Sequence, residues 1–115
     1  MTEEEKKLLK DIEQAVLNID IHLEGRRVWD EFVSNITKRR AIERELEIIG
    51  EATNKLLKIN PDISISAGRK IVNLRNRVIH AYDDVDETII WKVVMKDVPI
   101  LISEVQNLMT DPSEH

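Results

Sequence analysis

The chain contains no cysteine, and this absence removes a whole set of chemistries. Disulfides, thiolate nucleophiles and cysteine-ligated metal sites are all excluded. Its 115 residues include only three glycines and three prolines, while Glu, Lys, Leu and Ile are abundant. Because turn residues are scarce and helix formers dominate, the composition predicts an all-α fold. The length suits a single domain, residues 1–115, with a hydrophobic core of its own.

Long apolar runs and an overall positive charge are also missing. No stretch approaches the roughly 20 apolar residues that span a bilayer, and the first residues are polar and acidic, unlike a signal peptide. We therefore expect a soluble cytoplasmic protein that does not bind a membrane. The formal net charge of −5 argues against coating a polyanion through bulk electrostatics, although it leaves room for a small local basic site.

Apolar residues at steps of three and four predict an antiparallel bundle of four main helices plus one short extra helix. The four main helices are expected at about residues 2–23, 35–59, 64–82 and 87–108, and the short one near residues 29–32. Residues 110–115 are expected to form a frayed tail.

Capping and helix-breaking residues predict where several of these helices end or bend. Thr2 and Glu5 have the spacing of a capping box, and Gly25 is a suitable stop for the first helix. Pro61 ends the second long helix, because proline cannot continue the hydrogen-bond ladder. Pro99 lies inside the last helix and predicts a kink there.

The segment from residue 74 to residue 82 concentrates the reactive side chains of the chain. It holds Arg75, Asn76, His80 and Tyr82, the only tyrosine. An arginine that stays charged, an imidazole that exchanges a proton and a phenol lie within eight residues of one another. This set of groups suits work on a phosphate ester better than it suits filling a core.

A regular helix does not bring these four side chains to one face. At about 100° per residue, Arg75 and Tyr82 fall on the apolar face, whereas Asn76 and His80 fall on the other side. A charge on a core face must be paired or must open to a cleft. Two interpretations stay open. Arg75 forms a buried ion pair with a glutamate of the second long helix, or the helix unwinds before Tyr82 and Arg75 meets His80 in a polar cleft, within one subunit or between two.

The second long helix carries a charged stripe that bears on this choice. Arg40, Arg44, Glu47 and Glu51 recur at steps of three and four, so they share one face. Such spacing usually marks a solvated stripe with weak internal ion pairs. Alternatively, the stripe supports the cleft, where Glu47 or Glu51 would orient or pair with Arg75.

A cluster of acidic residues precedes the last helix and could be a metal site or a helix cap. The metal site is the weaker of the two interpretations. Asp83, Asp84, Asp86 and Glu87 lack the glycine and the distal glutamate of a calcium loop, and helix capping explains them. We therefore predict no metal site. His22 has no partner in the pattern and is expected to be a surface residue at a helix end.

The reactive segment resembles the signature of a known family. Arg75, four intervening residues, His80, one residue and Tyr82 match the motif of HepT-like toxins, a branch of the HEPN superfamily. The asparagine directly after the arginine fits the ribonuclease motif of that superfamily. Residues 40–52 are similar to the family's second-helix signature, and the resemblance as a whole covers about residues 29–91.

The resemblance implies a HEPN-like homodimer that acts as a metal-independent endoribonuclease toxin of a toxin–antitoxin pair. Arg75 would hold and stabilise the RNA phosphate, and His80 would transfer protons. Asn76 would orient either the phosphate or the imidazole of His80. The implied antitoxin is an MntA-like nucleotidyltransferase that transfers AMP from ATP to the motif tyrosine, here Tyr82. ATP and Mg²⁺ would belong to that partner, so no cofactor is expected on this chain.

A second interpretation belongs to another class of protein. The chain would be a non-catalytic helical binding module that docks a nucleotidyltransferase partner, a role that suits its acidic balance. The presence of Arg75, Asn76 and His80 favours the ribonuclease, since docking alone has no need of that combination. Because the chain has only four aromatic residues for stacking on bases, we expect loose RNA specificity.

Overall fold

The computed structural model describes residues 1–66, 68, 70–73 and 87–110 of the chain. All regular elements in these ranges are helical, so the predicted all-α class is confirmed. Gly68 and residues 70–73 are helical as well. The elements are α1 (Glu3–His22), α2 (Trp29–Ser34), α3 (Ile36–Ile59), α5 (Glu87–Lys92), the π-helical η1 (Val93–Asp97) and α6 (Val98–Thr110).

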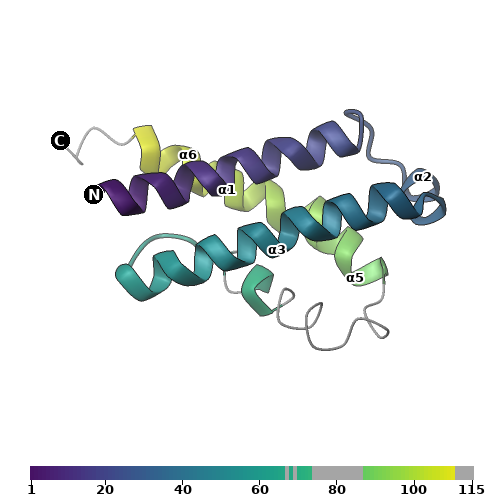
Figure 1. The fold of residues 1–115 in the computed structure, drawn as a ribbon. Helices are drawn as coiled ribbons and strands as arrows, with labels where there is room; N and C mark the ends of the chain where they lie inside the picture. The colour runs from purple at the N-terminus through teal and green to yellow at the C-terminus, as the bar shows by residue number, and fades with distance from the viewer. Residues whose placement is uncertain (67, 69, 74–86, 111–115) are drawn as a thin grey trace.

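The two longest helices, α1 and α3, lie side by side and run in opposite directions (Figure 1). The short α2 lies at the end where the chain turns from one to the other and packs against α3. The chain then returns through α5, η1 and α6 to the end where α1 begins, and α6 packs against α1 (Figure 1). The structure thus has the antiparallel arrangement that the hydrophobic periodicity predicts.

The core is formed by the apolar stripes of these helices. On α3 the apolar residues Ile42, Leu46, Ile49 and Leu56 recur at steps of three, four and seven and are fully or almost fully buried. Burial of such side chains contributes about 1.5–3 kcal/mol each. No helix in the part of the chain described above is both long and apolar enough to cross a membrane. The largest side chains with less than 2 % exposure are Phe32, Leu9, Ile12, Ile19, Leu23, Ile42, Leu46, Ile49, Leu56, Ile71, Ile90 and Leu101.

The ends of α1 follow the local signals in the sequence. The Glu5 N–H donates to Thr2 Oγ1 at 3.1 Å and the Thr2 N–H donates to a Glu5 carboxylate oxygen at 3.5 Å, which confirms the capping box. At the other end, Glu24 and Gly25 both have positive φ, of 57° and 71°. The left-handed turn therefore begins one residue before the glycine that was expected to provide it.

Pro99 disturbs the last helix, as predicted, but the disturbance takes the form of a π-helical segment. The five residues of η1 lie just before it, and the Val98 N–H donates to the Val93 carbonyl, five residues earlier. Proline has no N–H, and its ring crowds the carbonyl four residues before it, here that of Met95. The wider π turn accommodates this crowding. The helix then continues to Thr110, the first residue of the expected tail; residues 111–115 lie outside the described ranges.

Polar contacts fix the first part of the expected third helix against η1 and α6. The Ser66 N–H and hydroxyl donate to Glu104 Oε2 at 2.9 and 3.0 Å. Lys70 Nζ lies 3.6 Å from Asp97 Oδ1, a carboxylate that η1 holds in a buried position. Ile71 is fully buried in the core. Of the third helix expected at residues 64–82, only this first part lies within the described residues.

Gly68 makes the closest approach in this segment, and Gly68→Ala is expected to lower the free energy of unfolding by about 1–3 kcal/mol. A Cβ there would lie 2.5 Å from Thr53 Cγ2 and 2.8 Å from Ile65 Cγ2. Both neighbours are buried and β-branched, so their side chains cannot easily rotate away. Urea denaturation measures the loss.

The matched control for this prediction is the double variant Gly68→Ala with Thr53→Ser, which removes the nearer methyl group. Its loss of stability is expected to be smaller than the sum of the two single losses, because the steric overlap is relieved. Strict additivity of the two changes would contradict the steric explanation.

Candidate functional site

The charged stripe of α3 is exposed except at the half-buried Glu47, and it bears the local ion pairs that its spacing predicts. Arg40 and Arg44 are exposed, and Arg44 Nη1 donates to Glu47 Oε2 at 3.1 Å. Glu51 Oε1 lies 4.0 Å from Lys55 Nζ. Pairs as exposed as these contribute little to stability, typically 0–1 kcal/mol. The stripe is therefore a solvated surface with charges available to a ligand.

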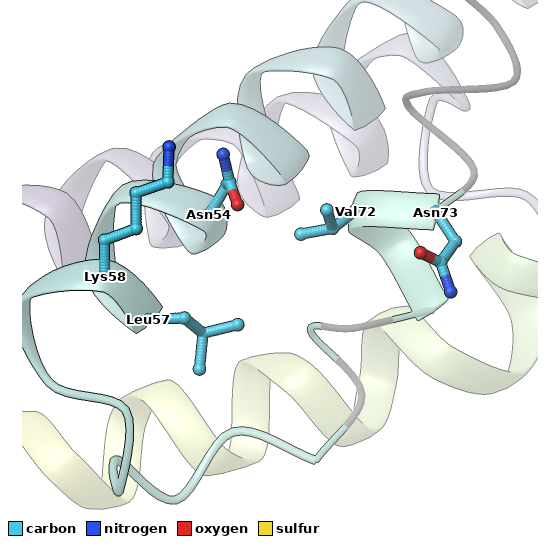
Figure 2. Close-up of a pocket in the computed structure, with 5 residues that line it drawn as sticks. All are labelled: Asn54, Leu57, Lys58, Val72 and Asn73. Atoms are coloured by element: carbon cyan, nitrogen blue, oxygen red, sulfur yellow. The ribbon is translucent and has the colours of Figure 1, made fainter.

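The same face of α3 continues into a pocket. Asn54 and Lys58 follow Glu51 at steps of three and four, so they extend the stripe toward the end of the helix. Together with Leu57 they form one wall of a pocket of about 370 Å³, and Val72 and Asn73 form the opposite wall (Figure 2). The stripe thus leads toward residues 72–73, which directly precede the reactive motif in the sequence.

Arg39, which adjoins the other end of the stripe on α3, contacts the start of α5. Arg39 Nη1 donates to the Val33 carbonyl and to Glu87 Oε1, each at 3.1 Å. Arg39 and Asn54 are 15 positions apart on α3, which corresponds to roughly 22 Å along the helix axis. The described chain stops at Asn73 beside one end of the stripe and resumes at Glu87 beside the other.

A half-buried glutamate, Glu43, lies on α3 at the edge of the stripe. Burial raises the pKa of the Glu43 carboxyl, Arg40 and Arg39 oppose this rise, and the nearby carboxylates of Glu47 and Glu87 reinforce it. Perturbed carboxyls often accompany functional sites. Its position in the sequence gave no reason to single it out, because burial and the charge of Glu87 both depend on packing between distant segments.

Glu43→Gln is expected to raise the free energy of unfolding more at pH 7 than at pH 4. The pKa of Glu43 is higher in the folded state than in the unfolded state, so the folded state holds the proton more tightly. The wild-type chain therefore loses stability as the pH rises from the pKa of the unfolded state through that of the folded state. The amide does not ionise, so the variant escapes this reduction. Urea denaturation at both pH values measures the difference.

Glu51→Gln, an exposed change on the same helix, is the control for losing one negative charge from the stripe. A gain at pH 7 that is equal in the two variants would assign the effect to net charge rather than to burial of Glu43.

The predicted catalytic residues Arg75, Asn76 and His80, and the predicted modification site Tyr82, lie outside the described residues. The choice between a buried ion pair of Arg75 and a polar cleft shared with His80 therefore stays a prediction. Within the described chain, Glu47 and Glu51 already have partners in Arg44 and Lys55.

The acids before the last helix lie mostly outside the described residues as well. Asp83, Asp84 and Asp86 fall in the range 74–86, whereas Glu87 is described and pairs with Arg39. Among the described residues, no three histidines or carboxylates gather as they would around a metal ion. The prediction that the chain holds no metal site is not tested for the acids at 83–86.

The expectation for His22 is wrong in one respect. It is the last residue of α1, as expected, but it is half-buried and its Nε2 lies 2.8 Å from Glu45 Oε2 on α3. Asn18 Nδ2 donates to the other carboxylate oxygen of Glu45 at 3.4 Å. The pair joins two helices across 23 positions of sequence, a contact that periodicity within one helix does not reveal.

Comparison with known families gives a match over most of the chain. The model of the family described as ribonuclease HepT-like matches residues 12–108, a range that includes the α3 stripe and the whole reactive motif. The chain therefore belongs to the HepT-like family of ribonucleases.

Individual relatives are consistent with this membership. A probable ribonuclease HepT of Thermococcus cleftensis is 31% identical over 112 residues, which cover 94% of this chain and 98% of that protein. A putative RNase of Methanocaldococcus jannaschii is 38% identical over 82 residues, 68% of this chain and 72% of that protein. A putative RNase of Caldanaerobacter subterraneus is 34% identical over 82 residues, 70% and 73% of the two chains. No solved structure gives a significant match.

Proposed function

We propose that the chain is a metal-independent endoribonuclease and the toxin of a toxin–antitoxin pair. The observation that carries this proposal is the family match over residues 12–108, because it spans the motif formed by Arg75, Asn76, His80 and Tyr82. Relatives named as ribonucleases that align over most of their own length support it further.

The proposed reaction uses the nucleophile that RNA itself carries. The 2′-hydroxyl oxygen attacks the adjacent phosphorus and loses its proton, while the bond from phosphorus to the 5′-oxygen breaks and that oxygen gains a proton. His80 would carry out proton transfer, and Arg75 would stabilise the charge that develops on the phosphate oxygens. The products are a 2′,3′-cyclic phosphate and a 5′-hydroxyl end.

In this proposal the α3 stripe forms one wall of the cleft. Arg40 and Arg44 are exposed and offer positive charge for the RNA backbone, and Glu47 and Glu51 limit how Arg75 can orient. Two described positions support this arrangement: Asn73 lines the pocket at one end of the stripe, and Glu87 pairs with Arg39 near the other end. The chain between these two points holds all the motif residues.

A second copy of the chain is part of the proposal. Arg75 and His80 fall on different faces of a regular helix, so one subunit with such a helix cannot present both to the same phosphate. A homodimer would bring two motifs to one shared cleft, where the second subunit could supply the missing group. Sedimentation at several concentrations tests the dimer, and a chain that cleaves RNA as a stable monomer would contradict it.

The test of the proposed function is cleavage of RNA by the purified chain in excess EDTA. We expect cleavage at the same rate with EDTA and with added Mg²⁺. A strict requirement for a divalent ion would contradict the mechanism. No cleavage under either condition, with tight binding to a nucleotidyltransferase, would instead support a non-catalytic docking module.

Tyr82→Phe is expected to keep RNA cleavage and to lose neutralisation by the proposed MntA-like antitoxin. AMP transfer to the phenol would add a negative charge and a bulky nucleoside beside His80 and exclude the RNA phosphate. Mass spectrometry after co-expression with the nucleotidyltransferase should find mass increments of AMP on the wild-type chain and none on the variant. Increments that persist on the variant would place the modification elsewhere.

A further inference from the structure

We propose that the pocket between α3 and residues 72–73 is a subsite for one nucleotide of the RNA strand, next to the phosphate that is cleaved. The subsite is lined by Asn54, Leu57, Lys58, Val72 and Asn73. This inference rests on the proposed ribonuclease function and adds to it a place where the substrate is held and read.

The size and apolar walls of the pocket suit a nucleobase. Its volume of about 370 Å³ is at the small end of the range for ligand pockets, so it admits one base and its sugar but no duplex. Leu57 and Val72 extend toward the space between the two walls (Figure 2). Aliphatic side chains on two sides give a flat base apolar contact on its faces, in a chain that offers few aromatic residues for stacking.

The polar lining suits the edge of a base. Asn54 comes from α3 and Asn73 from the opposite wall, and each amide offers a carbonyl acceptor and an N–H₂ donor (Figure 2). Paired donors and acceptors are the groups that distinguish one base from another along its hydrogen-bonding edges. None of the described residues that line the pocket is a carboxylate, so these side chains do not repel the backbone of a nucleic acid.

Lys58 supplies a charge for a phosphate. It is exposed, and no salt bridge is found for it within the described ranges. Lys55, one turn earlier on the same helix, differs because its Nζ lies 4.0 Å from Glu51. A lysine without an acidic partner at the rim of a pocket is well placed to bind a phosphate as a point charge.

The position of the pocket relates it to the proposed cleavage site. Asn54 and Lys58 continue the face of α3 that bears Arg40 and Arg44, so a strand following this face passes the pocket. Asn73 precedes Arg75 by two residues in the sequence, and two residues of chain reach at most about 7 Å. A nucleotide held here would therefore be close to the backbone of Arg75.

A second pocket in the described chain has a lining that suits RNA less well. The pocket of about 280 Å³ near the start of α1 is lined in part by the acidic residues Glu5 and Asp62. Two acids at a small cavity disfavour a polyanion. Within the described chain, the pocket beside Asn73 is the better match to RNA.

Binding of an uncleavable 2′-O-methyl RNA hexamer to the full chain, followed by fluorescence anisotropy, tests the role of Lys58. We expect Lys58→Ala to raise Kd several-fold and to reduce the slope of log Kd against log salt by about 0.7, the value for one phosphate contact on a single strand. Lys58→Arg should retain the wild-type slope. Lys55→Ala is the matched control and should leave both quantities unchanged.

Cleavage of oligonucleotides that differ in one base beside the scissile linkage tests the reading of the base. The wild-type chain should prefer some bases several-fold in kcat/KM, and Asn54→Ala should reduce that preference, chiefly through KM. If the wild-type chain cleaves RNA but Lys58→Ala and Asn54→Ala match Lys55→Ala in binding and preference, the subsite is overturned while the ribonuclease stands. If the wild-type chain does not cleave RNA at all, the proposed function fails, a result that cannot be confused with the first.

Discussion

His80→Ala is expected to lower kcat for RNA cleavage in EDTA by at least about 100-fold, the usual contribution of a general acid–base group. Without the imidazole, the 2′-hydroxyl has no positioned group to take its proton, and water replaces it poorly. The loss should appear in kcat rather than in KM, because His80 is proposed to act on the transferring proton and not to hold the strand. Single-turnover cleavage of a defined RNA measures it.

His22→Ala provides a matched control, since it removes another imidazole from the same chain. His22 contacts Glu45 at 2.8 Å between α1 and α3, so its loss should reduce stability and leave kcat within about twofold below the melting temperature. Equal losses of cleavage in both variants would indicate general damage to the fold. Unchanged cleavage in His80→Ala would remove His80 from the mechanism.

Phe32→Ala is expected to lower the free energy of unfolding by about 3–5 kcal/mol. Phe32 is fully buried, and its ring centre lies 5.0 Å from that of Trp91 on α5 and 6.1 Å from that of Trp29. A loss of this size is a large part of the 5–15 kcal/mol typical of a domain. The three rings join α2 to α5, the helix that positions Glu87 beside Arg39. Urea denaturation monitored by tryptophan fluorescence measures the change.

Phe32→Leu separates the loss of ring contacts from the loss of volume. It keeps an apolar side chain in the cavity and should cost less than the alanine variant, with about 0.5–1.5 kcal/mol due to the aromatic pairs. A loss below 1 kcal/mol for Phe32→Ala would show that the rings are not the principal contact between α2 and α5.

Local signals in the sequence predicted the ends of α1 and α3 well because their causes are local. Thr2 and Glu5 form the expected capping box, and α3 ends at Ile59 just before Asn60-Pro61. Pro99 predicted a disturbance of the last helix but not its form. Whether the backbone bends or widens into a π turn depends on how the neighbouring core residues pack, and the local sequence does not contain that information.

The candidate site could be predicted only where its residues share a helix. The spacing of Arg40, Arg44, Glu47 and Glu51 was sufficient to place them on one face of α3. The contact of Arg39 with Glu87 joins positions 48 residues apart, and the raised pKa of Glu43 depends on the same packing. Helical periodicity does not report on contacts between separate helices. The roles of the motif residues were available through resemblance to a family, not through spacing alone.

Cleavage of a DNA oligonucleotide that contains one ribonucleotide, in excess EDTA, tests the proposed mechanism most directly. If the RNA strand supplies the nucleophile, the wild-type chain should cut only after the single ribose and leave a 2′,3′-cyclic phosphate and a 5′-hydroxyl end. Arg75→Ala should remove this cut because the developing charge on the phosphate is no longer stabilised. Cleavage at deoxyribose linkages, or 5′-phosphate products, would contradict metal-independent cleavage by the motif of Arg75 and His80.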